Sequence, residues 1–355
     1  MKLRNILGIV FCCSSLAIQA QTDVSDFVPG STLEGVSYFL PKTAFRVTVV
    51  TEKTVTKPGD FYKYANRYLR LSDVPTEEKT EWGIKSIKLE PFGVPDKNKA
   101  YSIKIKSKTV APLVGLSNDG ILLSINTEAT EEVLPELPEP IPAAKLDNPR
   151  SYMTKEILAA GSTAKMAELC AEEIYDLRES RNALIKGEAD NTPKDGAQLQ
   201  LMLSQLDKQV EALESLFKGT QQTSTEVTSF NYLPEEESDK EILFRFSQKL
   251  GIVDADDLAG APIYVSVKCT GTLPKKEVDE ETAKKKAKME KGVYYNIPLR
   301  TKVTVFNSQQ EFFTTELPMG QFGIVEILSN LLFDKLATTK VTFFQTSGGT
   351  KDIMK

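Results

Sequence analysis

Two runs of apolar residues at heptad-like spacing constrain the fold of this 355-residue chain more than any other feature. Within each run, one residue of the set recurs every three or four positions. The first run is Ala167, Cys170, Ile174, Leu177, Arg181 and Leu184, and the second is Leu199, Leu203, Leu206, Val210, Leu213 and Phe217. Such stripes are typical of paired helices with coiled-coil packing. Because a short loop joins them, we predict an antiparallel helical hairpin of about 30 Å within residues 151–219.

The ends of these two helices carry recognisable signals. Gly187 and Gly219 are predicted to end them as left-handed caps, which glycine adopts without a steric penalty. Thr192-Pro193 offers an N-cap followed by proline at the first position of the second helix. The polar tip of the hairpin, Gly187 to Asp195, is then either a docking surface or a solvated loop.

Arg181 is unusual because a charged residue occupies a position of the apolar seam. A carboxylate across the seam would satisfy the guanidinium and fix the register of the helices. Glu188 and Asp195, close to the tip, are the candidate partners. The alternative is a site for an external anion.

The remainder of the chain favours strands. Phe45, Val47 and Val49 alternate with polar residues, which is the pattern of a half-buried strand. Residues 127–149 contain five prolines among acidic residues and therefore predict an extended, stiff linker. We expect an α+β fold that is β-rich, with β regions at 35–126 and 224–355 and the antiparallel coiled-coil hairpin inserted between them. Lys275 to Lys291 reads as a solvated helix or loop, and Phe322 to Leu336 as a helix or a buried strand pair.

The two β regions share a short internal similarity. Residues 35–41 followed by 46–49 match residues 292–298 followed by 302–305 with one gap and seven identities. Chance similarity between strands is one explanation. Two related β units, one on each side of the hairpin, are the other, and the shared tyrosine and proline favour it because neither residue is generic in strands.

The N-terminus has the composition of a removable export signal. Lys2 and Arg4 precede a short apolar core, and small residues lead to an expected cleavage after Ala20, so residues 1–20 form the predicted signal peptide. The apolar core is too short to span a bilayer, and no later segment approaches the required length. Lipidation at Cys12 or Cys13 is the alternative, but Phe11 and Cys12 are not the small residues expected before a lipidated cysteine.

The composition excludes several classes of function. The chain has no histidine, which removes Ser-His-Asp and Cys-His nucleophile systems and histidine-ligated zinc. Without the two basic residues of the signal, 42 of the 44 basic residues remain against 49 acidic ones, a net charge of −7. Such a balance argues against nucleic acid as a partner. Paired carboxylates or a Ser-Lys pair remain as means of catalysis.

Few residues suggest a metal site or a disulfide. Asp254, Asp256 and Asp257 form the tightest carboxylate cluster, and calcium binds oxygen ligands on loops, but an EF-hand spacing is missing and capping of a turn explains the same residues. No cofactor motif is present. Cys170 and Cys269 are the cysteines beyond the signal, and both fall on apolar faces, so we expect two buried free thiols in preference to a disulfide.

Several motifs resemble one known family. They are the Gly-Val-x-Tyr-x-Leu-Pro entry at Gly35, the Ile174–Arg181 segment, Leu243–Ser247 and Val253–Gly260. Together they resemble a secreted family of Bacteroidota, catalogued as domain of unknown function 4831, over nearly all of the mature chain. The resemblance implies an envelope or extracellular location and transfers no active-site residues.

The sequence leaves two functions to compare. The first is a non-enzymatic exported protein of the periplasm, the outer-membrane surface or the extracellular space. It would act as a binding or assembly module with an envelope protein, or a glycan, as its partner and would have no transmembrane segment. The second is a carbohydrate-active hydrolase that uses paired carboxylates about 5 to 10 Å apart.

Overall fold

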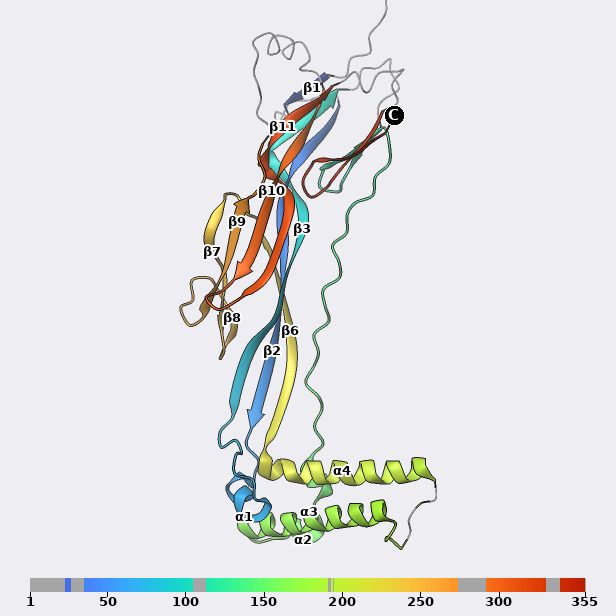
Figure 1. Cartoon of the computed structure of the whole chain (residues 1–355), viewed down its shortest axis with the longest axis vertical. Helices are drawn as coiled ribbons and strands as arrows, with labels where there is room; N and C mark the ends of the chain where they lie inside the picture. The colour runs from blue at the N-terminus through green and yellow to red at the C-terminus, as the bar shows by residue number, and fades with distance from the viewer. Residues whose placement is uncertain are drawn as a thin grey trace, which may run out of the picture.

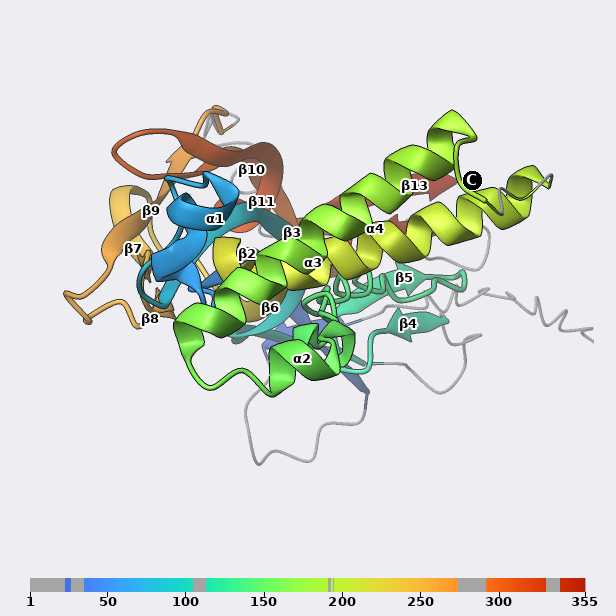
Figure 2. The same ribbon diagram turned by 90° about the horizontal axis from the view of Figure 1, so that it is seen from below.

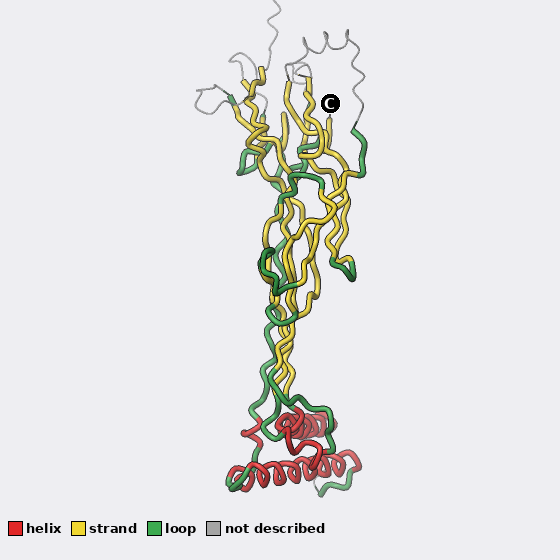
Figure 3. Tube along the Cα trace, turned by 90° about the vertical axis from the view of Figure 1, so that its left-hand side faces the viewer, coloured by secondary structure: helices red, strands yellow, loops and turns green. Residues whose placement is uncertain are grey.

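The computed structural model describes residues 23–26, 35–104, 113–190, 193, 195–273, 292–329 and 339–354. The molecule is elongated, with helices at one end and strands through the rest of its length (Figures 1 and 3). The predicted β-rich α+β class is confirmed by this layout. The predicted signal peptide and the Lys275–Lys291 segment lie outside the described residues.

Sheet A forms the long axis of the molecule. Its antiparallel strands lie in the order β1 (Asp23–Asp26), β3 (Lys79–Lys104), β2 (Val36–Lys57) and β6 (Thr220–Tyr232). Towards the helices only β3, β2 and β6 continue, as a three-stranded ribbon that we call the shaft. Shaft residues Glu52 to Lys57 are charged or threonine except for Val55, and none of them is buried, so both faces of the ribbon are solvated.

Sheet C packs against the upper part of sheet A. Its order is β11 (Glu311–Ser329), β10 (Gly292–Phe306), β9 (Ala261–Cys269), β7 (Ser238–Ser247) and β8 (Gly251–Val253). The alternating residues Phe45, Val47 and Val49 meet Val265 and Val303 in the core between the sheets. The segment Phe322–Leu336 is predicted as a helix or a buried strand pair. Its first part, Phe322 to Ser329, belongs to strand β11 and is not helical.

A third sheet mixes strands from both ends of the chain. Sheet B has the order β13 (Thr350–Met354), β12 (Lys340–Phe343), β5 (Leu122–Ile125) and β4 (Val114–Leu116). Since β5 pairs with β12 and β2 pairs with β6, the predicted β regions 35–126 and 224–355 share sheets and cores. The linker therefore separates them in sequence and not in space, because strand pairing does not require neighbours along the chain.

The two similar sequence segments occupy equivalent positions. Each begins the first strand of a long antiparallel hairpin, β2–β3 or β10–β11. The register of each hairpin shifts at the aligned proline, between Phe39 and Pro41 in one and between Ile297 and Leu299 in the other. Each long hairpin is followed by two short strands of sheet B. This arrangement favours two related β units over chance similarity.

The helical end contains several short helical elements and two long helices. The short elements are two 3-10 turns at Tyr62–Tyr64 and Pro149–Tyr152, α1 (Ala65–Leu69) and α2 (Lys155–Leu158). The long ones are α3 (Thr163–Lys186) and α4 (Gly196–Lys218), which lie side by side when seen from below (Figure 2). We call α3 and α4 the helical hairpin.

The caps of the helical hairpin agree with the prediction in part. Gly187 ends α3 in the left-handed conformation. Gly219 ends α4 with a positive φ of 76° but an extended ψ of −173°, so it is not a left-handed cap. The predicted start of the second helix at Thr192-Pro193 is wrong: α4 begins at Gly196, and the Asp195 side chain accepts a hydrogen bond from the backbone of Ala197.

Residues 127–148 form neither helix nor strand and run from sheet B to the helices along the shaft (Figure 1). We call this segment the strap. The proline content that predicts an extended linker explains its conformation. The strap is tied down near its start, where the Glu131 carboxylate accepts two hydrogen bonds of 2.6 Å from Asn118, and the Glu132 backbone donates to Gln345 Oε1 at 2.7 Å.

Candidate interaction surface on the helical hairpin

The base of the helical hairpin is fixed to the shaft by a core of its own. Phe61, which follows strand β2, packs against Phe217 of α4 with ring centroids 5.4 Å apart. Its backbone N–H donates to Leu216 O at 2.6 Å. Gly59 approaches α4 so closely that a Cβ there would lie 2.2 Å from Leu216 O. The hairpin therefore projects from a rigid mount.

Burial along the predicted seam decreases towards the tip. At the base, Cys170, Ile174, Leu213 and Phe217 are fully buried. Further out most of the apolar seam residues are only half-buried, namely Leu177, Leu199, Leu203 and Leu206, whereas Leu184 of α3 is buried (7% exposed). The distal half also exposes apolar side chains outside the seam: Ile185 (54%), Leu201 (61%) and Met202 (37%).

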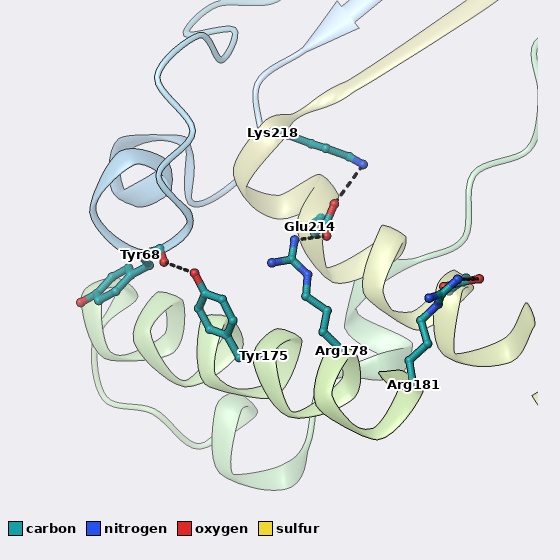
Figure 4. A network of polar contacts seen from close by, with 7 residues as sticks. Tyr68, Tyr175, Arg178, Arg181, Glu214 and Lys218 are labelled. Atoms are coloured by element: carbon teal, nitrogen blue, oxygen red, sulfur yellow. Dashed lines mark hydrogen bonds and ion pairs between the residues drawn. The ribbon is translucent and has the colours of Figure 1, made fainter. Parts of the chain in front are cut away.

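An ion-pair network joins α3 to the last two turns of α4 (Figure 4). Glu214 of α4 accepts a hydrogen bond of 2.6 Å from Arg178 of α3 and lies 3.3 Å from Lys218 Nζ, one turn further along α4. Only 19% of the Glu214 side chain is exposed, so the two cations compensate a largely desolvated carboxylate. The spacing of Glu214 and Lys218 is the i, i+4 spacing that favours such pairs on a helix.

Arg181 pairs with a residue that the sequence did not point to. Its partner is Asp207 of α4, with Nε 2.5 Å from Oδ1, and not Glu188 or Asp195. The prediction is wrong because the tip residues lie beyond the reach of mid-helix positions: Arg181 faces the middle of α4 in this antiparallel register. Asp207 follows Leu206, and Glu214 follows Leu213, so acidic residues directly after seam leucines were the signal that could have identified both partners.

Tyr175 ties α3 to the short helix α1. Its hydroxyl donates to the backbone oxygen of Tyr68 at 2.9 Å, as Figure 4 shows. The Arg178 guanidinium lies over the Tyr175 ring at 5.6 Å. These contacts hold the middle of α3 against α1 and α4.

The two cysteines differ in environment. Both are free, as predicted. Cys170 is buried in the hairpin base, where desolvation, with a smaller effect of Glu173, raises the pKa of its thiol to about 12. Cys269 is only half-buried, so the prediction of burial is wrong for this residue. It ends strand β9, where its backbone N–H donates to the Glu237 carboxylate and its side chain lies beside Thr301.

The aspartate cluster shapes a surface turn. Asp254, Asp256 and Asp257 are exposed in the loop after β8. Asp257 N donates to Asp254 O at 3.1 Å, and the Asp257 carboxylate accepts a 2.8 Å hydrogen bond from Ala259 N. These are turn contacts of the kind that aspartate commonly makes. Within the described ranges, no three acidic or cysteine side chains gather in a way that could hold a metal ion.

A groove over the outer face of sheet B was not signalled by the sequence. Its volume is about 500 Å³, and Leu123 and Gly115 of the sheet, with Glu128 and Glu132 of the strap, are among its lining residues. Lys351 of β13 also lines it. The two carboxylates come from one extended segment, so no sequence motif predicts that they line a groove.

Comparison with known proteins gives one match. The family model described as a domain of unknown function, DUF4831, matches residues 34–351. Neither the curated proteins nor the solved structures include a match to the chain. Among the described helices, none is both long and apolar enough to cross a membrane.

Proposed function

The chain belongs to the DUF4831 family, and we propose from this premise that it is a non-enzymatic exported protein of the Bacteroidota envelope. It would bind or assemble with another protein through the distal half of its helical hairpin. The export part of the proposal rests on the basic and apolar residues 2–11 and the small residues before Ala20.

One observation carries the binding role: the distal half exposes Ile185, Leu201 and Met202 although its base is firmly packed. Exposed apolar side chains on a rigid projection are typical of protein interaction sites. A pre-organised mount lowers the entropic cost of binding, since the contact residues are already held in place. Coiled-coil packing of α3 and α4, with the half-buried leucines continuing the seam, would let a partner helix extend the same apolar stripe.

The test is site-specific photocrosslinking in cells. A photoreactive residue replaces Leu201 (61% exposed) in one variant and Leu258 in the control, which is a more accessible leucine (83% exposed) in the loop after β8. We expect a discrete crosslinked protein from the Leu201 position and none from Leu258. Equal labelling at both positions, or none at Leu201 and Ile185, would refute the hairpin as the contact surface.

The alternative, a carbohydrate-active hydrolase, has its best location in the groove over sheet B. Glu128 and Glu132 are the only pair of carboxylates among the described residues that line this groove. Glycan hydrolysis that is present in the parent and lost in both Glu128→Gln and Glu132→Gln would favour the enzyme over the binding module.

A further inference from the structure

The outer edge of strand β6 is long and has few protecting features within the strand itself. β6 is an edge strand of sheet A, with β2 on its inner side. Its thirteen residues, Thr220–Tyr232, contain one charged residue, Glu226, and no lysine, arginine, proline or glycine, and their register with β2 has no bulge. Charged residues, prolines and bulges are the devices by which edge strands normally avoid pairing with other chains.

The register with β2 identifies which main-chain groups point outward. Thr225 N donates away from β2, to Ile141 O of the strap, at 2.8 Å. Because hydrogen-bonding direction alternates along an antiparallel strand, the N–H groups of Thr223, Val227 and Ser229 point the same way. Nothing in the described part of the chain accepts a hydrogen bond from these three. Thr223 and Ser229 are exposed and Val227 is half-buried, so solvent reaches the strand at these three positions.

The strap lies along this edge in the register of a fifth strand. Ile141 N donates to Thr225 Oγ1 at 2.7 Å, in addition to the bond just described. Three residues further on, Ala144 O accepts a 2.8 Å bond from Gln222, which lies three residues before Thr225. Six residues earlier, Pro135 O accepts a bond from Arg46, whose partner across the β2–β6 ladder is Asn231, six residues after Thr225. All three contacts fit one antiparallel alignment with β6.

Proline prevents the strap from completing that alignment. Pro138, Pro140 and Pro142 alternate through its central part and hold the chain near the polyproline conformation, which has a period of three residues where a strand has two. Successive residues therefore cannot keep facing β6, and one backbone-to-backbone hydrogen bond forms where a regular strand of this length would form several. The strap therefore covers the edge but accepts no hydrogen bonds from the outward N–H groups of Thr223, Val227 and Ser229.

We propose that the outer edge of β6 is a strand-accepting site and that the strap is its displaceable cover. The occupant is an extended, proline-free segment of another protein that runs antiparallel to β6, as the strap does, and places a β-branched residue opposite Thr225, where the strap has Ile141. Such a segment gains the main-chain hydrogen bonds that the strap leaves unmade. This site is separate from the distal hairpin surface and does not depend on the proposed function.

The test uses the full chain and a synthetic probe. The probe is a fluorescent peptide with the sequence of Leu137–Ala144 in which threonine replaces the three prolines. The protein carries Ile141→Cys and Thr225→Cys in a Cys269→Ser background; facing residues of a hydrogen-bonded antiparallel pair lie about 5.5 Å apart, within disulfide range. Oxidation locks the strap on the edge, and the reduced form of the same protein is the control.

We expect the peptide to bind the reduced protein at least tenfold more tightly than the oxidised one, by fluorescence anisotropy. The unaltered, proline-containing peptide should bind at least tenfold more weakly than the threonine version. Equal binding to both redox forms, or no binding to the reduced form, overturns the proposal. Dimerisation of the reduced protein through β6 without peptide overturns the choice of occupant in favour of a second copy of the chain.

A second variant guards against misfolding of the cysteine protein. In the full chain with Pro138→Thr, Pro140→Thr and Pro142→Thr, the strap itself should pair along β6. We expect amide hydrogen exchange at Thr223, Val227 and Ser229 to slow at least tenfold relative to the parent, while Thr228, which faces β2, changes little. Unchanged exchange at all three outward amides would contradict the edge assignment.

Discussion

Replacing Leu213 with alanine tests the packing that mounts the helical hairpin on the shaft. Leu213 is fully buried at the base of the hairpin, in the cluster that contains Phe61, Cys170, Ile174 and Phe217. The change removes three carbon atoms, worth about 2.4 kcal/mol in transfer free energy at about 0.8 kcal/mol each. The aromatic and helical neighbours cannot fully close the cavity, so we expect a total loss of about 3 to 4 kcal/mol.

The matched control is Leu201→Ala on the same helix. Leu201 is 61% exposed, so its truncation should change the free energy of unfolding by about 0.5 kcal/mol or less. Urea unfolding followed by circular dichroism at 222 nm reports on the helices. Fluorescence of Trp82, the one tryptophan of the chain, reports separately on the shaft, where it lies in strand β3.

We expect Leu213→Ala to lower the midpoint of the helical transition more than that of the Trp82 transition, because the hairpin base and the sheets have separate cores. The packing argument is refuted if Leu213→Ala unfolds within about 1 kcal/mol of the parent. It is equally refuted if Leu201→Ala costs as much as Leu213→Ala.

Three further predictions concern single sites. Glu214→Gln should lower the free energy of unfolding in urea by about 1 to 2 kcal/mol, since it leaves Arg178 and Lys218 without their shared carboxylate. Asp207→Asn should lower it by about 0.5 kcal/mol or less, because Asp207 is more exposed. Equal effects of the two changes would contradict the network. Gly251→Ala should destabilise the contact of the β7–β8 turn with Trp82 and shift the Trp82 fluorescence. The reason is that Gly251 has a φ of 82° and that a Cβ there would lie 3.2 Å from the indole. Gly83→Ala, where the added Cβ meets open space, should leave the fluorescence unchanged. Above pH 9 and until about pH 12, the free energy of unfolding should fall by up to about 1.4 kcal/mol per pH unit. The reason is that the pKa of the Cys170 thiol is raised to about 12 in the folded protein, so the thiol stays protonated there and ionises in the unfolded chain. A Cys170→Ala variant that keeps the same slope would show that other groups cause it.

Local sequence patterns were sufficient for the helices and for many strands. The heptad stripes located both helices of the hairpin because side chains on one helix face recur at a spacing that neighbours along the chain fix by themselves. The left-handed end of α3 at Gly187 was also readable, since it depends on the φ preference of a single residue.

The ion-pair partners were readable only in part. The sequence showed that Arg181 needs a carboxylate but not that Asp207 supplies it, because the choice depends on the relative height of α3 and α4, which the base cluster sets. The half-exposed position of Cys269 likewise depends on where strand β9 ends relative to its neighbours.

The set of elements could therefore be read from local sequence: a β-rich chain, a pair of long antiparallel helices and an extended proline-rich segment. Each depends on contacts or conformational preferences within a few residues. How these elements combine depends on contacts between distant parts of the chain. The pairing of β2 with β6 and of β5 with β12 joins residues far apart in the chain. The strap lies on the open edge of β6 for the same reason: hydrogen bonds between distant strands carry no signal in the order of residues, since main-chain groups are alike at every position.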